Sequence, residues 1–419
     1  MRTDRNTTNR NTAGVGRRSL LGAAGALPLA GLGAGSARAQ APGPIKIGVL
    51  CDMSGMYKDD TGPGLVAAVK IAVTEMGGSV NGQPVVVVGA DDQNKPDVGV
   101  AVARRWMDEE GVGAIVTASA SSITLAVSDL ARQRNRVLLV AGSLSADITG
   151  KQCSPTTFQF GLDTFAGPKS VVEPAVKNGM TTWHILYVDY AFGQSLKNEA
   201  QRLIEASGAK VVGTTAFPLN SSDLSSALLA AQSSGAKAIA LACGGSDWSN
   251  LVKQAHEFGM AGGKQSLVSL TAGINEIMAA GPENCIGMLA SMPFYWDLDE
   301  GTRAFNAKFR PLHDGVYPNW QQADGYNGAL HYLKAVKSAG TTDGARVADA
   351  MRATPVDDLI IKGAPIRADG QVLRPTYLMR VKTESRKGLA DILEHVATLS
   401  PADSWRPADQ SACPALKRA

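Results

Sequence analysis

Short apolar runs alternate with stretches of helical periodicity over the first third of the chain. The runs are nearly uninterrupted, as in strands buried on both faces of a sheet. They cover Ile45–Cys51, Val85–Ala90, Ala114–Ala118 and Arg136–Ala141. Between them, apolar residues recur at helical spacing over Gly64–Met76, Asp97–Glu110 and Ile123–Gln133. Such alternation forms βαβ units, so the pattern predicts a doubly wound parallel sheet.

The same alternation then begins again and predicts a second α/β lobe. Further strands are predicted at Trp183–Val188, Lys210–Phe217, Lys237–Cys243, Ser266–Leu270 and Ile286–Ala290. Helices are predicted between them at Gly193–Ser207, Asp223–Ser234 and Ser249–Phe258. The last part adds helices at Gly301–Phe309, Gln322–Ala339 and Gly344–Ala353, and a hairpin across Ala364–Val381 that turns at Asp369-Gly370. We therefore expect an α/β protein with two Rossmann-like lobes.

The N-terminal segment has the pattern of an export signal. Two arginines, Arg17 and Arg18, precede an apolar stretch that runs from Leu20 to about Gly35. Ala37–Ala39 then has the small-x-small form of a cleavage site. We expect residues 1–39 to be a twin-arginine signal peptide, with an ordinary signal peptide as the alternative. The remaining chain should work in the periplasm without stable membrane insertion, since no later run of 18 apolar residues occurs.

Charge and cysteine content refine this picture. The formal net charge of +3 becomes −2 when the arginine-rich first 39 residues are set aside, so no nucleic-acid partner is expected. Cys51 and Cys243 close apolar runs and should be buried thiols. Cys153 and Cys413 lie in polar, proline-flanked loops and are candidates for a disulfide in an oxidising compartment, although the connectivity stays open.

The motifs of catalysis are largely absent from the sequence. It has no phosphate-binding loop of the Walker type and no nucleophile elbow. Its five histidines are scattered without the spacing of metal ligands: His184, His256, His313, His331 and His395. The paired carboxylates Asp91-Asp92 are read as helix-capping or solvated groups. We expect a site that binds without reacting, with no metal and no cofactor.

Several segments, in their order and spacing, resemble the type I periplasmic binding proteins of ABC importers, in the branched-chain amino acid receptor family. They are Ile45–Val49 with Asp52–Gly55, Thr117–Ser122, Tyr187–Gly193, Pro218–Asp223 and Lys237–Gly245. Within the family, four segments are similar to a branch that often takes aromatic or other organic acids: Cys153–Phe158, Phe294–Asp297, Ile366–Gly370 and Cys413-Pro414.

The resemblance implies two lobes joined by a three-crossover hinge, with ligand trapped as they close. It places the crossovers near residues 158–162, 291–294 and 354–358. The N-terminal lobe would comprise residues 40–158 and 294–354, and the C-terminal lobe residues 159–293 and 355–419. We expect a monomer whose partners are a small ligand and importer permease subunits.

Ligands of open parallel sheets gather beyond the carboxyl ends of the strands. Two strand-to-helix junctions of the first lobe offer small residues, hydroxyls and amides there to a carboxylate: Ser119, Ala120, Ser121 and Ser122, and Ala141, Gly142 and Ser143. Simple N-capping is the alternative role of these hydroxyls. The other candidates are Tyr190, Phe192, Ser246, Asp247 and Thr271 from the second lobe, with Tyr57 and Tyr295 as aromatic walls. Aromatic residues near strand ends also serve as core.

One departure from the family bears on the ligand. Amino acid receptors of this family pair the ligand's ammonium with an acidic residue of the second lobe, and Ser269–Gly273 holds no carboxylate. Asp247 is the candidate substitute for this acidic residue. Because a buried, unpaired ammonium is costly, we expect a carboxylate with an apolar or aromatic body, in preference to an amino acid. The alternatives are a ligand-sensing partner of a membrane receptor and, from another class, a secreted α/β hydrolase.

Overall fold

The computed structural model describes residues 43–260, 263–384 and 391–417. The predicted signal peptide at residues 1–39 lies outside them. The described residues belong to one compact unit, Gly43–Ala419, so the predicted lobe boundaries stay predictions. Among these residues, no helix has the length and apolar character needed to cross a bilayer.

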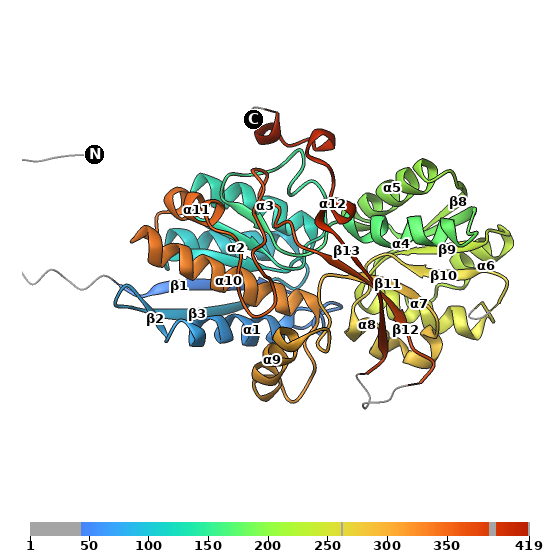
Figure 1. Cartoon of the computed structure of the whole chain (residues 1–419), viewed down its shortest axis with the longest axis horizontal. Helices are drawn as coiled ribbons and strands as arrows, with labels where there is room; N and C mark the ends of the chain where they lie inside the picture. Colours follow the sequence, from blue (N-terminus) through green and yellow to red (C-terminus); the bar gives the residue numbers. More distant parts are fainter. Residues whose placement is uncertain (1–42, 261–262, 385–390, 418–419) are drawn as a thin grey trace, which may run out of the picture. The chain divides into compact units, whose positions relative to one another are not determined.

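The first lobe is built on a six-stranded sheet in the order β2-β3-β1-β4-β5-β6. Its strands are β1 (Ile45–Cys51), β2 (Ser79–Val80), β3 (Gln83–Asp91), β4 (Val112–Thr117), β5 (Val137–Val140) and β6 (Thr157–Gln159). All pairs are parallel except β2 with β3. Every residue of β4 is buried, because helices cover both faces of this sheet. The covering helices are α1 (Gly62–Glu75), α2 (Pro96–Asp108), α3 (Ser121–Gln133), α10 (Trp320–Ala339) and α11 (Gly344–Ala353) (Figure 1).

The second lobe repeats this architecture on a four-stranded parallel sheet in the order β10-β9-β7-β8. Its strands are β7 (Thr182–Val188), β8 (Lys210–Phe217), β9 (Ala238–Ala242) and β10 (Ser266–Ser269). Its helices are α4 (Ala166–Lys177), α5 (Ala191–Ala206), α6 (Ser225–Ser233), α7 (Gly245–Glu257) and α8 (Ile274–Ala280) (Figure 1). The prediction of two doubly wound lobes is confirmed.

A third, antiparallel sheet corrects the prediction for the last part of the chain. It consists of β11 (Leu289–Met292), β12 (Thr376–Val381) and β13 (Leu393–Leu399), in that order. The predicted hairpin across Ala364–Val381 is reduced to isolated bridges near its turn, because prolines 365 and 375 remove the amide donors that a continuous ladder needs. Two other short elements complete the fold, α9 (Glu300–Phe309) and α12 (Pro401–Ser404).

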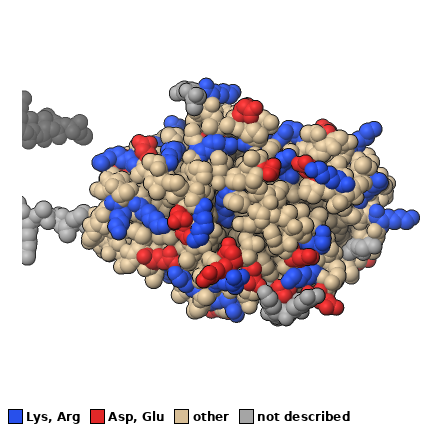
Figure 2. Space-filling model, viewed as in Figure 1, with Lys and Arg blue, Asp and Glu red and all other residues tan. Residues whose placement is uncertain are grey.

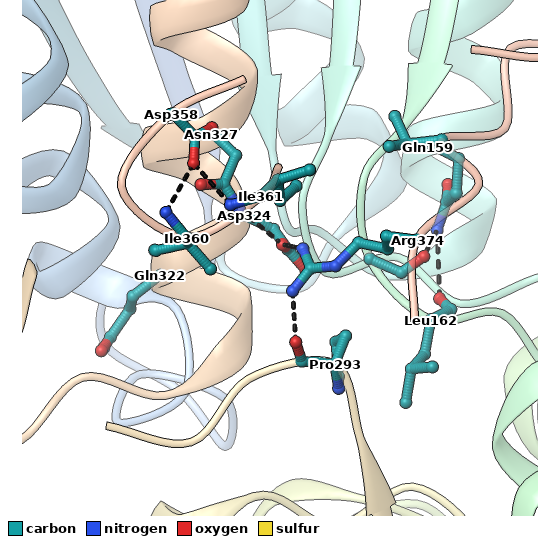
Figure 3. A network of polar contacts seen from close by, with 12 residues as sticks. Gln159, Leu162, Pro293, Gln322, Asp324, Asn327, Asp358, Ile360, Ile361 and Arg374 are labelled. Carbon is teal, nitrogen blue, oxygen red and sulfur yellow. Dashed lines mark hydrogen bonds and ion pairs between the residues drawn. The ribbon is translucent and has the colours of Figure 1, made fainter. Parts of the chain in front are cut away.

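The segments that pass between the lobes are joined by a buried arginine (Figure 3). The Arg374 guanidinium contacts the carboxylate of Asp324 in α10 and donates to the Pro293 carbonyl, just after β11. Residues 370–372, just before Arg374, pair with Gln159 of β6. Arg374 thus links two passages between the lobes to a helix of the first lobe.

The C-terminal tail is fixed by the disulfide that the sequence suggested. Cys153 and Cys413 are bonded, with 5.7 Å between their Cα atoms. Before reaching Cys413, the tail packs α12 against α4, and Arg406 pairs with Glu199 of α5. The tail therefore connects the second lobe to the loop before β6 of the first lobe. Cys51 and Cys243 are free and buried, as predicted.

Candidate functional site

A cavity lies between the two lobes, at the carboxyl ends of their strands. The first lobe contributes Tyr57, Asp60, Thr61, Ala118, Ser119, Ala120, Ser121, Gly142, Ser143, Leu144, Trp320 and Gln321 to its lining. The second lobe contributes Tyr190, Phe192, Gly244, Gly245, Thr271 and Glu276.

The first-lobe wall presents the N-terminus of α3. Ala120 precedes this helix and provides no side-chain cap, and the Ile123 amide donates to the Ala120 carbonyl (2.9 Å), which leaves the amides of Ser121 and Ser122 without a capping oxygen. The Ser121 hydroxyl accepts a hydrogen bond from the Ser145 amide (3.3 Å), which leaves its own proton for a ligand. Ser119 and Ser143 instead donate to the carbonyls of Leu50 (3.1 Å) and Ser119 (2.6 Å). Their hydroxyls hold the loops together, and the amides and Ser121 are the donors that remain.

Two tyrosines join the lobes at the edge of the cavity. The hydroxyls of Tyr57, from the first lobe, and Tyr190, which precedes α5 of the second, are 2.5 Å apart. The Tyr57 ring also lies against Gly245, which has a φ of +60°, and a Cβ there would be 2.8 Å from the ring. Only glycine allows this approach at this backbone conformation. The lobes are thus in contact across the cavity.

Two buried carboxyl groups line the cavity from opposite lobes. Glu276, in α8, accepts hydrogen bonds from the amides of Gly245 (2.7 Å) and Gly273 (2.5 Å). Burial raises the pKa of Glu276 to about 7. Asp60 comes from the loop before α1, and its pKa is raised by burial and then by the negative charge of Glu276. The expectation that the second lobe offers the ligand no carboxylate other than Asp247 is therefore wrong.

Two further polar atoms at the cavity have no hydrogen-bond partner within the described residues. They are the indole Nε1 of Trp320 and the side-chain oxygen Oε1 of Gln321, both buried. Asn319 and Gln322 cap each other's amides (3.0 and 3.1 Å), which fixes the start of α10 and the position of these two side chains. Since buried donors and acceptors are rarely left unpaired, they are groups for a ligand to satisfy.

Most of the candidate residues line this cavity. Those that do are Tyr57, Ser119, Ala120, Ser121, Gly142, Ser143, Tyr190, Phe192 and Thr271. Ser122 and Ser246 are exposed, because each lies one residue farther into a helix than a lining residue and turns away by about 100°. Ala141 is buried in the core of the first lobe.

The last two candidates, Asp247 and Tyr295, do not line the cavity. Asp247 is buried and accepts a hydrogen bond from the Asn220 amide (3.1 Å), so it holds a loop of the second lobe. Tyr295 lies at a separate hollow beside Met379 of β12 and Leu393 of β13, because the chain turns away from the cavity after β11.

The lining residues that sequence reasoning missed are Asp60, Thr61, Ala118, Leu144, Gly244, Gly245, Glu276, Trp320 and Gln321. Sequence could have indicated some of these residues, since Ala118, Leu144 and Gly244-Gly245 adjoin loops that already held candidate residues. Trp320 and Gln321 had no such signal, because α10 returns to the first lobe after the whole second lobe.

Comparison with known proteins agrees with this geometry. The sequence profile of the periplasmic binding protein family matches residues 44–388. This chain belongs to that family. It is a periplasmic solute-binding protein of the ABC transporter type, and its relatives are transport proteins and not enzymes.

Individual relatives support the assignment. The crystal structure of a periplasmic binding protein from Burkholderia mallei is 36% identical, with a TM-score of 0.86, over 89% of this chain and 99% of that one. The Leu/Ile/Val-binding protein homolog 7 of Brucella abortus is 26% identical over 79% of this chain and 86% of its own length. A solute-binding protein from R. palustris in complex with benzoate is 19% identical, with a TM-score of 0.77 over 88% and 99% of the two chains, and shares the fold.

Proposed function

We propose that this protein captures a small carboxylate-bearing ligand between its lobes and delivers it to an ABC importer in the periplasm. The observation that carries the proposal is the uncapped N-terminus of α3 at the cavity, with the Ser121 hydroxyl beside it. Helix N-termini favour anions through their free amides and the helix dipole. No lysine, arginine or histidine is among the described lining residues, so these neutral donors would hold the carboxylate.

The outer surface gives no support to a polyanionic partner. On the face seen in Figure 2, basic and acidic side chains are interspersed. Nucleic-acid sites instead gather lysine and arginine into one patch or stripe. This agrees with the near-neutral charge of the chain after its first 39 residues, and it supports a small molecule as the ligand.

An organic acid with an apolar or aromatic body is the first candidate within this class. Phe192, Leu144 and the Trp320 ring supply apolar and aromatic walls at the cavity. The indole N–H of Trp320, which has no partner within the described residues, suits an acceptor on the ligand. Delivery would follow closure of the lobes over the ligand, with no bond made or broken.

An amino acid is the second candidate, and a specific observation favours it. Glu276 and Asp60 place two carboxyl groups at the cavity, where a ligand's ammonium would find opposite charge. The Brucella relative named above is called a Leu/Ile/Val-binding protein homolog, and the R. palustris structure contains benzoate, so both ligand classes occur among proteins of this fold.

A thermal-shift screen of the mature protein with matched pairs of ligands tests the proposal. The pairs are L-phenylalanine with 3-phenylpropionate, and L-leucine with 4-methylpentanoate, with benzoate added. A ligand that binds the folded protein at 100 times its Kd adds about 2.7 kcal/mol of stability, which is readily seen. We expect the amine-free acid of each pair to give the larger shift. Larger shifts with the amino acids would establish the second candidate, and no shift with any carboxylate would overturn the proposal.

A further inference from the structure

Asp60 and Glu276 approach the cavity from opposite lobes. Asp60 belongs to the loop that follows β1, and Glu276 to the first turn of α8. Both line the same cavity, and each residue is 5% exposed. The lobes touch beside them, where the Asn275 side chain donates to the Asp59 carbonyl (2.5 Å). The two carboxyl groups therefore become buried together only when the lobes meet.

The hydrogen bonds of the two groups are unequal. Glu276 accepts from two backbone amides, one at each oxygen. Asp60 is engaged only through its main chain: its amide donates to the Tyr57 carbonyl (3.0 Å), and its carbonyl accepts from the side-chain amide of Asn319 (2.7 Å). Within the described residues, no donor reaches the Asp60 carboxylate oxygens. A buried carboxylate without a donor is costly, so this group requires a proton or a cation beside it.

The surrounding charges do not supply that cation. Asp59, the neighbour of Asp60 on the same turn, is acidic, and so is Asp247 of α7, beyond Glu276. The other titratable groups at this end are neutral in their usual state: Tyr57, Tyr190 and Cys243. Described residues that line the cavity include no basic side chain. Two like charges at one buried site cannot both ionise readily.

We propose that Asp60 and Glu276 cannot both stay charged in the closed cleft, so that closure of the empty cleft takes up at least one proton. The inference rests on the proposed function only in taking the two lobes to open and close. A ligand with a positive group would replace the proton, whereas an amine-free acid would bind together with it. Affinity for an amine-free acid should therefore rise as the pH falls, and affinity for an amino acid should not.

The direction of the pH effect on closure follows from the pKa values of the two groups in the closed form. Burial, and for Asp60 also the charge of Glu276, raises both pKa values when the lobes meet, that of Glu276 to about 7. In the open form both groups face water and titrate near 4. Proton uptake therefore stabilises the closed form most at a pH below the open-form pKa values. This stabilisation is lost as the pH rises towards 7. The closure constant should fall by up to about tenfold per pH unit in this interval for each proton taken up.

Small-angle X-ray scattering of the ligand-free mature protein at pH 5.0 and pH 8.0 tests the inference. We expect a smaller radius of gyration at pH 5.0 for the wild type. Asp60→Asn should reduce the difference, because only Glu276 then takes up a proton on closure. Asp59→Asn is the matched control, since this exposed neighbour should leave the pH dependence as in the wild type. Equal radii at both pH values in the wild type, or an undiminished dependence in Asp60→Asn, would overturn the inference.

Glu276→Gln provides a second test if Asp60→Asn does not fold. Its amide nitrogen would face one of the two backbone amides that donate to Glu276, so some loss of stability is expected alongside a smaller pH dependence. This outcome is separate from that of the proposed function. If the protein binds carboxylates in the thermal-shift screen but scatters identically at both pH values, the proposed function stands and the proton-linked closure is refuted.

Discussion

Replacement of Arg374 by methionine tests how much the passages between the lobes depend on one buried ion pair. The side chain of Arg374 is 3% exposed and that of Asp324 is fully buried. The guanidinium contacts Asp324 and the Pro293 carbonyl, as Figure 3 shows, and the Trp405 indole donates to the Arg374 carbonyl (2.7 Å). Methionine retains much of the length of arginine and removes its charge and donors.

These contacts give a range for the loss of unfolding free energy expected in Arg374→Met. Removal of one partner of a buried ion pair costs about 3–5 kcal/mol. Asp324 would keep only the Asn327 amide (3.1 Å). Burial already raises the pKa of Asp324 to about 7, and without the lowering effect of Arg374 it would be protonated at neutral pH. Protonation removes the unpaired charge, so the lower end of the range, about 3 kcal/mol, is expected.

Urea and thermal unfolding followed by circular dichroism measure this loss. An unfolding entropy of about 2.1 cal/mol/K per residue gives ~0.8 kcal/mol/K over Gly43–Ala419, so Tm should fall by about 4 °C. Arg132→Met is the control, because Arg132 and its partner Asp129 are both half exposed and their pair should contribute less than about 1 kcal/mol. A loss for Arg374→Met no larger than that of the control would refute the reasoning.

Three further predictions concern the tail and the cavity. Replacing both Cys153 and Cys413 by serine should lower the unfolding free energy by about 2–5 kcal/mol in urea titrations, and unchanged stability would contradict a role for the tail in joining the lobes. Gly245→Ala should weaken ligand binding at least about tenfold in calorimetry, because its Cβ meets Tyr57 only when the lobes are closed. Gly235→Ala has a similar positive φ in open space and should leave affinity unchanged. Ser121→Ala should weaken carboxylate binding about 10–100-fold, whereas equal affinity would exclude its hydroxyl as a donor.

The doubly wound lobes could be predicted because central strands such as β4 and β9 are buried on both faces. Uninterrupted apolar runs such as Ala238–Ala242 have no other stable place in a soluble α/β protein. The third sheet was harder to predict. β13 is mostly exposed, with Leu393 as its one buried residue, so no apolar run marks it as the partner of β12. The predicted hairpin across Ala364–Val381 placed β12 with the residues just before it, whereas β12 pairs with β13.

The candidate site likewise contains residues that the sequence predicted and residues that it did not. Loops after parallel strands, such as Ser119–Ser121 and Tyr190, follow from the rule that ligands bind at the carboxyl ends of strands. Glu276 lies in a helix, where a lone acidic residue is most often solvated, and only the fold turns it into the cavity. Asp60 looks like an ordinary loop residue until α10 covers it. Sequence reasoning therefore located the Ser119–Ser121 wall of the cavity and missed the acidic residues Asp60 and Glu276.

Titration calorimetry with an acid and the amide that replaces its carboxylate by a neutral group tests the central claim most directly. The pairs are benzoate with benzamide and L-leucine with L-leucinamide, measured on the mature protein. The account predicts that at least one acid binds and that its amide binds at least about 100-fold more weakly, because loss of the carboxylate removes the charge-assisted bonds at the N-terminus of α3. An amide that binds as tightly as its acid would contradict a carboxylate site in this cavity.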